Sequence, residues 1–236
     1  MCPLLEADFE LDTQREKVNQ ALAQHVFSVG ILKGNTLTPK KNVVILPYTV
    51  ETLVENHVSV MVERGLGSGA EFIDLDYADS GAEIEDEQGQ VIRKADILVC
   101  LRPLSPGELL KLRDDRMVIL PMSTGEISAA QLAVMHEKKI TALSLRLVKN
   151  VVGEELLQDI LGAQGGNLRA SAALGDLVLS LIFPLLFARN LREAVRMYPS
   201  LLNAIYCYKG ILTRQEIAER LHLPWSDLLQ LCWDWN

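Results

Sequence analysis

Apolar runs alternate with amphipathic segments over the first two thirds of the chain. The near-continuous apolar runs predict strands, because a parallel strand covered by helices on both faces of its sheet is buried on both sides. The segments between them carry apolar residues at helical spacing and are bounded by turn residues. The predicted strands are 28–33, 58–63, 95–101, 117–122 and 140–145, and the predicted helices are 12–25, 49–56, 74–80, 105–112 and 128–138.

This alternation is typical of an α/β protein with a doubly wound, mainly parallel sheet of the Rossmann or flavodoxin type. Ser128 is a suitable N-cap for the predicted helix 128–138, because its hydroxyl can accept a hydrogen bond from an unpaired amide of the first turn. The carboxylate-rich segment from Glu83 to Glu87 is interpreted as a solvated turn.

The pattern changes after Val148. Residues 149–169 are mixed and include a glycine-containing stretch, whereas residues 170–236 are predicted to be helical. We expect a single domain over residues 1–236, in which an α/β core at 27–148 is completed by the C-terminal helices.

The apolar run from Leu174 to Ala188 has two interpretations, a transmembrane helix or a buried core helix. The run is shorter than the roughly 18–20 apolar residues that a bilayer requires, and Asp176 and Arg189 bracket it. A buried core helix is therefore favoured, and no membrane association is expected. Pro184 is expected to kink or end this helix.

Composition narrows the function further. The chain has 49% hydrophobic and 23% charged residues, which is ordinary for a folded globular protein, and its net charge of -8 disfavours a nucleic-acid surface. No apolar leader is visible in residues 1–17, and no metal site is suggested by cysteine or histidine spacing. Free thiols in a reducing, cytoplasmic setting are expected for the four scattered cysteines, which are Cys2, Cys100, Cys207 and Cys232.

Six segments, in the same order, resemble the alanine dehydrogenase and nicotinamide nucleotide transhydrogenase N-terminal domain family. Each motif is weak by itself, but their shared order strengthens the resemblance. The segments are Phe27–Lys33 (family VGIPKE), Asn42–Pro47 (RVALTP), Val58–Gly69 with the following Phe72–Tyr77 and Ser80–Ile84, Ala95–Pro103 (ADLILKVKEP), Tyr206–Thr213 (YKGxLT) and Leu223–Leu228.

The resemblance implies a substrate domain whose family partner, a dinucleotide-binding domain, is inserted after the fifth or sixth strand. Residues 149–169 are too few to form such a domain, so they are expected to be a connector that replaces it. The resemblance therefore predicts a truncated relative that binds no NAD. No cofactor-binding residue is predicted.

The family's catalytic side chains are also replaced. Its substrate-binding arginine falls at Asn42, its lysine at Cys100, and its acid/base histidine at or near Thr124; a further family aspartate would belong to the missing domain. An amide cannot supply the bidentate charge of a guanidinium, and a threonine hydroxyl does not titrate near neutrality. No catalytic residue is predicted. Asn42, Cys100 and Thr124, with Met122, are expected to line a vestigial cleft.

Three other motifs have functional alternatives. Gly65-Leu-Gly-Ser-Gly69 follows a strand, but acidic residues follow it, so a tight turn is favoured over a phosphate-binding loop. Cys100 is interpreted as a buried apolar residue in preference to a nucleophile, since no histidine is near it in sequence. Residues 212–228 resemble a helix-turn-helix, but the would-be recognition helix has no lysine or arginine, so DNA binding is disfavoured.

The expected function is therefore non-catalytic: an assembly partner or small-metabolite binder that uses the old interdomain cleft. Apolar surface exposed by the loss of a domain must be covered, so a homodimer is expected, and Trp233-Asp-Trp235 either folds back or meets a partner. The alternative is enzymatic, with the chain as the substrate half of a split dehydrogenase completed by a separate NAD-binding chain.

Overall fold

The computed structural model describes residues 27–34, 45–122, 126–149, 155–162, 167–188, 190–198, 200–211, 216 and 219. The predicted helix 12–25 and most of the C-terminal tail, including all of the helix-turn-helix segment except residues 216 and 219, lie outside the described residues. The strands are β1 (Ser28–Leu32), β2 (Ser59–Glu63), β3 (Glu83–Glu85), β4 (Ile97–Cys100), β5 (Met117–Leu120), β6 (Thr141–Ser144) and β7 (Ile205–Cys207). The helices are α2 (Pro47–Glu55), the short 3-10 helix η1 (Leu66–Gly69), α3 (Asp74–Asp79), α4 (Gln88–Lys94), α5 (Pro106–Leu109), α6 (Ala129–Glu137), α7 (Leu156–Gly162), α8 (Asn167–Phe187), α9 (Leu191–Met197) and α10 (Ser200–Ala204).

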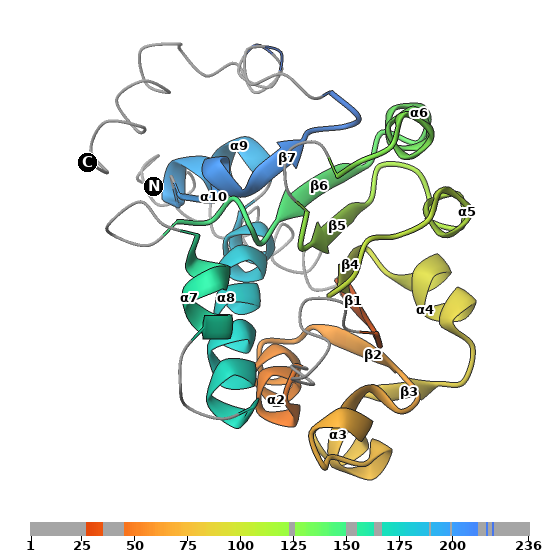
Figure 1. Ribbon diagram of the computed structural model, residues 1–236, viewed down its shortest axis with the longest axis vertical. Coiled ribbons are helices and arrows are strands. Elements are labelled where there is room, and N and C mark those ends of the chain that lie inside the picture. The colour runs from red at the N-terminus through yellow and green to blue at the C-terminus, as the bar shows by residue number, and fades with distance from the viewer. Residues whose placement is uncertain are drawn as a thin grey trace, which may run out of the picture.

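The strands form one twisted sheet in the order β3-β2-β1-β4-β5-β6-β7, with helices on both faces (Figure 1). Strands β1 to β6 are parallel, and β7 pairs with β6 in the antiparallel direction. The prediction of a doubly wound, mainly parallel α/β fold is confirmed.

Two apolar clusters hold the sheet between its helical layers. On one face, strand residues such as Val29 and Val99 pack with α2, α7, α8 and α9. On the other face, residues such as Leu98 and Val118 pack with α4, α5 and α6. Every residue of β4 is buried, as its continuous apolar run predicts.

The interpretation of Glu83 to Glu87 as a solvated turn was wrong for its first three residues. They form the edge strand β3, in which Ile84 pairs with Val62 of β2. A three-residue strand with glutamates at both ends gives no apolar run to detect, and such charged, short strands are common at sheet edges because they resist pairing with other chains. Helix α4 was missed in the same region.

The prediction that residues 170–236 are helical was wrong at β7. This strand follows α10 without an intervening loop, and its three residues continue the apolar character of the helix before them. Cys207 pairs with Ala142 and Ile205 with Leu143, so the chain returns to the sheet from the helical layer.

Helix α8 is long and apolar enough to cross a membrane over Leu168–Phe187, but 61% of that window is buried within the fold. The exposed apolar residues Leu168 and Phe187 lie at the two ends of the helix, whereas the exposed positions between them are Arg169, Ala172, Asp176 and Ser180. A lipid-facing helix would place apolar side chains there. The prediction of a core helix is supported, and the helix continues three residues beyond Pro184, which therefore does not end it.

Candidate functional site

The carboxyl ends of the parallel strands meet at one edge of the sheet, where ligands of open α/β folds usually bind. The connection from β1 passes through α2 on one face, whereas the connection from β4 passes through α5 on the other. The carboxyl ends of β1 and β4 therefore form the topological switch point. The loops that follow β1 and β4 lie close together here, since a Cβ added to Gly34 would lie 3.1 Å from the Cδ of Arg102.

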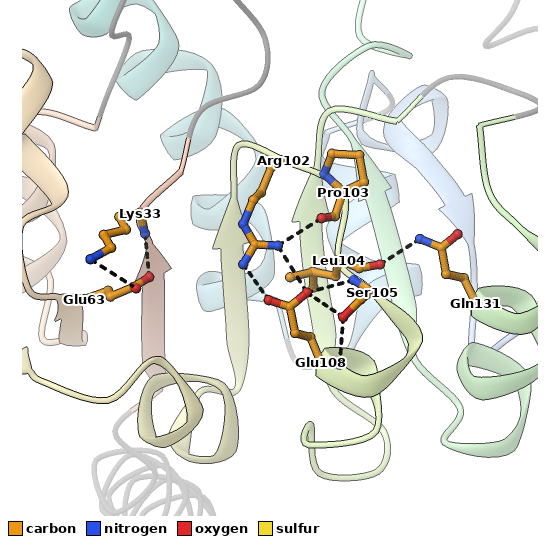
Figure 2. Close-up of polar contacts among 8 residues, drawn as sticks. All are labelled: Lys33, Glu63, Arg102, Pro103, Leu104, Ser105, Glu108 and Gln131. Atoms are coloured by element: carbon orange, nitrogen blue, oxygen red, sulfur yellow. Dashed lines mark hydrogen bonds and ion pairs between the residues drawn. The ribbon is translucent and has the colours of Figure 1, made fainter.

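Lys33 and Glu63 form one polar group at this edge (Figure 2). The backbone amide of Lys33 donates to Oε2 of Glu63 at 2.9 Å, and Nζ of Lys33 lies 3.8 Å from Oε1. The Glu63 side chain is only 8% exposed, while that of Lys33 is 54% exposed. Glu63 therefore ties β2 to β1, and the ammonium is the accessible charge of the pair.

Arg102 and Glu108 form the second polar group, on the other side of the switch point (Figure 2). The guanidinium donates to both carboxylate oxygens of Glu108, with Nη1 to Oε2 at 3.1 Å, and also to the carbonyl of Pro103. Ser105 caps α5 and donates its own amide to Glu108. Both terminal nitrogens of Arg102 are thus engaged within the protein, so this arginine is not poised as a vacant carboxylate fork.

Glu108 is held in its ionised form. The hydrogen bonds from Arg102 lower its pKa to about 2, and bonds from Ser105 act in the same direction. The ionised carboxylate is therefore favoured in the folded protein over the unfolded chain.

The replacement Glu108→Gln tests this coupling. A depressed folded-state pKa contributes stability that is fully present above the unfolded pKa, near 4.5, and is lost as the pH falls towards 2. We expect the free energy of unfolding of Glu108→Gln, measured with urea at pH 7, to lie about 2 kcal/mol below that of the native protein. This difference should shrink below pH 4.5. The exposed variant Glu51→Gln should show no comparable change. A stability difference between Glu108→Gln and the native protein that stays constant down to pH 3 would contradict the low pKa assigned to Glu108.

Cys100 and Met122 are the predicted cleft residues that the structure describes. Cys100 is the one that stands where the resemblance places the family's lysine. It is the last residue of β4, is 0% exposed, and lies in the apolar cluster of the α4, α5 and α6 face. Burial raises the pKa of its thiol to about 11. The thiol is therefore protonated at neutral pH, and the interpretation of Cys100 as a buried apolar residue is supported.

Native Cys100 is expected to resist alkylation. A protonated and buried thiol should react with iodoacetamide at least about 100-fold more slowly at pH 7.5 than the same thiol in urea. Peptide mapping by mass spectrometry separates Cys100 from the other cysteines. Cys207, which is also buried with a pKa of about 11, serves as an internal comparison. Rapid native labelling of Cys100 would show that β4 opens at its end.

The loop after β5 is anchored from β6 at the same edge. The hydroxyl of Ser144 donates to the carbonyl of Met122, and Nε of Arg146 donates to the carbonyl of Pro121 at 3.3 Å. Met122 itself is 2% exposed. Asn42 and Thr124 lie outside the described residues, so the assembly of Asn42, Cys100 and Thr124 into a cleft stays a prediction.

The glycine-rich segment forms the predicted tight turn. Gly65 has a φ of 76°, and η1 follows it directly. The amide of Gly65 donates to Oδ1 of Asp74 at 2.6 Å, so a carboxylate of the protein occupies a donor that a phosphate-binding loop would direct at its ligand. A Cβ at Gly67 would meet Phe72 and Tyr77, which explains a glycine there by packing.

Asp96 organises the opposite, amino edge of the sheet. Its carboxylate accepts from the amide and the hydroxyl of Ser28, at 2.9 and 2.8 Å, and pairs with Arg113 and Arg116 at 3.2 and 2.6 Å. The side chain is 7% exposed. Asp96 thus joins the starts of β1, β4 and β5 as a structural group.

Sequence reasoning missed Glu63, Arg102, Glu108 and the role of Asp96. Their partners are distant in sequence or lie across a loop, so no local spacing signals them. The pair Ser105 and Glu108 was detectable, because serine followed three residues later by glutamate is the capping-box pattern. Within the described ranges, no group of three or more His, Cys, Asp or Glu side chains is arranged to hold a metal ion.

A doubly wound, mainly parallel sheet with a switch point between β1 and β4 defines a Rossmann-like fold. The profile of the alanine dehydrogenase/PNT N-terminal domain family matches residues 37–162, and the chain belongs to this family. The matched residues include Asn42, Cys100 and Thr124. The tail motif at Tyr206–Thr213 falls outside them and stays a resemblance.

Among solved structures, an L-alanine dehydrogenase is similar at 20% identity, with a TM-score of 0.49, over 57% of this chain and 37% of that chain. A transhydrogenase from Sinorhizobium meliloti is similar at 23% identity, with a TM-score of 0.46, over 56% of this chain and 38% of that chain. The chain thus spans well under half of either structure. No curated protein matches it.

Proposed function

We propose that this chain is a non-catalytic member of its family that acts by binding another molecule, either a protein partner or a small metabolite, at the carboxyl edge of its sheet. The observation that carries the proposal is the burial of Cys100, whose thiol is uncharged. Cys100 stands where the resemblance places the family's lysine. A buried thiol cannot donate a charge-assisted hydrogen bond to a substrate carbonyl as an ammonium can.

The connection between β6 and β7 supports the same proposal. Its described residues form α7 to α10; α7 contacts α8, and α8 contacts α2 and α9. These helices pack on the single sheet, and the residues described there build no second sheet. Hydride transfer requires a fold that holds the nicotinamide against the substrate carbon, so the helical character of the described connection favours a non-catalytic role.

Titration of the purified full chain with NADH, followed by nucleotide fluorescence, tests the proposal. We expect no saturable binding, and no oxidation of NADH with pyruvate and ammonia, under conditions where an authentic alanine dehydrogenase turns over. Saturable binding or turnover would refute it. Thermal-shift measurements with alanine and pyruvate then distinguish a metabolite binder from a protein that binds only macromolecules, since a ligand of the native state raises the melting temperature.

The alternative is a split dehydrogenase, in which a separate NAD-binding chain completes the site. The exposed ammonium of Lys33, beside the buried Glu63, favours this alternative because it leaves an accessible charge at the switch point. Co-purification with a Rossmann-fold protein that reduces NAD with alanine would establish the split enzyme and exclude the non-catalytic role.

We further propose a cytoplasmic homodimer. Large apolar side chains outside α2 and α3 are exposed in the described part of the chain, including Leu168, Phe187 and Tyr198, which is consistent with surface that a second copy covers. Light scattering after size exclusion tests the dimer, and a monomer at micromolar concentration would refute it.

A further inference from the structure

The net charge of the protein is concentrated in one short segment. Residues 71–87 contain eight acidic residues and no lysine or arginine. Because the chain has 31 acidic and 23 basic residues, the remaining sequence carries 23 of each sign and is balanced. The segment covers α3 and the edge strand β3, so the excess negative charge lies at one side of the sheet (Figure 1).

Internal ion pairs offset only part of this charge. Arg64 pairs with Asp74 and Asp86, and Lys94 pairs with Glu83 and Glu85. These pairs are at the surface, where Arg64 is 57% exposed and Lys94 is 46% exposed. Among the described residues, these two cations pair with the eight-carboxylate segment, which leaves a surplus of negative charge over α3 and β3.

Large apolar side chains are exposed at the same end of the molecule. Ile73, the N-cap of α3, is 62% exposed and Leu75 is 60% exposed, while Tyr48 at the start of α2 is 64% exposed. Both helices begin at the carboxyl edge, since each follows a parallel strand. The hydroxyl of Tyr77 in α3 donates to the carbonyl of Ile45, just before α2, at 2.7 Å and holds the two helix starts together.

Within the described part of the chain, Ile73 and Leu75 do not belong to either apolar core cluster. Phe72 and Tyr77 supply the buried contacts of α3, packing edge to face with ring centroids 6.5 Å apart. The capping role at Ile73 uses its backbone amide, which donates to Asp76 at 2.8 Å. Neither side chain is needed to fill the core, since both are mostly exposed.

We propose that the α3 surface, defined as Tyr48, Ile73 and Leu75 with the acidic residues of 71–87, docks an amphipathic basic segment of a protein partner. Apolar side chains of the partner would cover Ile73 and Leu75, and lysine or arginine side chains would face the surrounding carboxylates. A second copy of this chain would bring like charges together at this surface. Nucleic acid and anionic membranes are disfavoured for the same reason.

This inference rests on the proposed function and deepens it, because α2 and α3 begin at the carboxyl edge where a partner is proposed to bind. Its test uses peptide binding, so its failure is distinguishable from a failure of the NADH test. A failure of the peptide to bind the α3 surface would not change the outcome of the NADH titration. NADH binding would not change the outcome of the peptide titration.

The probe is a fluorescein-labelled helical peptide of about 18 leucine and lysine residues, titrated with the full chain by fluorescence anisotropy. We expect the native protein to bind the peptide, and the double variant Ile73→Ser/Leu75→Ser to bind it at least about tenfold more weakly. The affinity of the native protein should also fall as NaCl rises from about 50 to about 500 mM. Charge reversal by Asp79→Lys/Glu87→Lys should also weaken it. The matched control is Leu110→Ser, which changes another leucine that is 51% exposed, and it should leave affinity within about twofold.

A peptide of leucine and glutamate should not bind. The proposal is overturned if the leucine–lysine peptide does not bind, if Leu110→Ser weakens it as much as the double variant, or if the double variant has no effect. It is also overturned if light scattering shows a dimer that Ile73→Ser/Leu75→Ser dissociates, because the occupant would then be a second copy. Circular dichroism of each variant verifies that the exposed substitutions leave the fold intact.

Discussion

Replacing Gly210 with alanine is expected to lower the free energy of unfolding by about 3–4 kcal/mol. Gly210 has a φ of +79°, which strains any residue with a side chain. Its added Cβ would also collide with the α6 backbone, nearest to Cα of His136 and 2.8 Å from the carbonyl oxygen of Met135. A backbone cannot rotate away from such a contact as a flexible side chain can, so α6 or the β7 segment must move.

The same segment is fixed by hydrogen bonds that an alanine would displace. The amide of Gly210 donates to the carbonyl of Ile140 at 2.9 Å, and the amide of Lys209 donates to the hydroxyl of Thr141 at 3.2 Å. Urea unfolding followed by circular dichroism measures the loss. The control is Gly107→Ala, where a Cβ meets nothing within 4 Å and the expected change is within about 1 kcal/mol. Equal stability of the two variants would contradict the packing assigned to Gly210.

Removing the Asp96 carboxylate by alanine is expected to cost about 3 kcal/mol. The carboxylate is nearly buried, accepts two hydrogen bonds from Ser28, and pairs with Arg113 and Arg116. Without it, the amide of Ser28 and the Arg116 guanidinium, which is 24% exposed, lose their partner, and an unsatisfied group away from water costs more than the bond itself contributed.

The control is Asp114→Ala, which removes a carboxylate that is 75% exposed and pairs with Lys138 at 3.0 Å. A surface pair of this kind is worth at most about 1 kcal/mol. The urea midpoint of Asp114→Ala should therefore stay close to that of the native protein. The midpoints of Asp96→Asn and Asp96→Ala should both lie well below the midpoint of Asp114→Ala. If Asp96→Ala unfolds at the same urea concentration as Asp114→Ala, the amino-edge cluster is not a major source of stability.

Periodicity predicted the sheet core because its strands are buried on both faces. Ile97–Cys100 and Met117–Leu120 are continuous apolar runs, and their observed bounds lie within the predicted segments. The N-cap at Ser128 was also predictable, since the hydroxyl accepts from the amide of Gln131 within one helical turn. Both patterns involve residues close together in the chain, so they can be recognised from a single sequence.

The polar groups of the candidate site depend on the three-dimensional fold. Ser28 and Asp96 are 68 residues apart, and Lys33 and Glu63 are 30 residues apart, so only strand order brings them together. The burial of Cys100 was predicted from its apolar run, whereas its neighbours Arg102 and Glu108 pair across the loop into α5. The family resemblance supplied the cleft positions, which local physics alone would not have selected.

Strand β7 has a consequence for how the polypeptide is made. It completes the sheet beside β6, yet 60 residues separate Ser144 from Ile205. At about 5–20 residues per second, a ribosome needs several seconds to synthesise that interval. During this time the growing polypeptide carries an open hydrogen-bonding edge, so newly made molecules are more prone to intermolecular strand pairing than the finished protein.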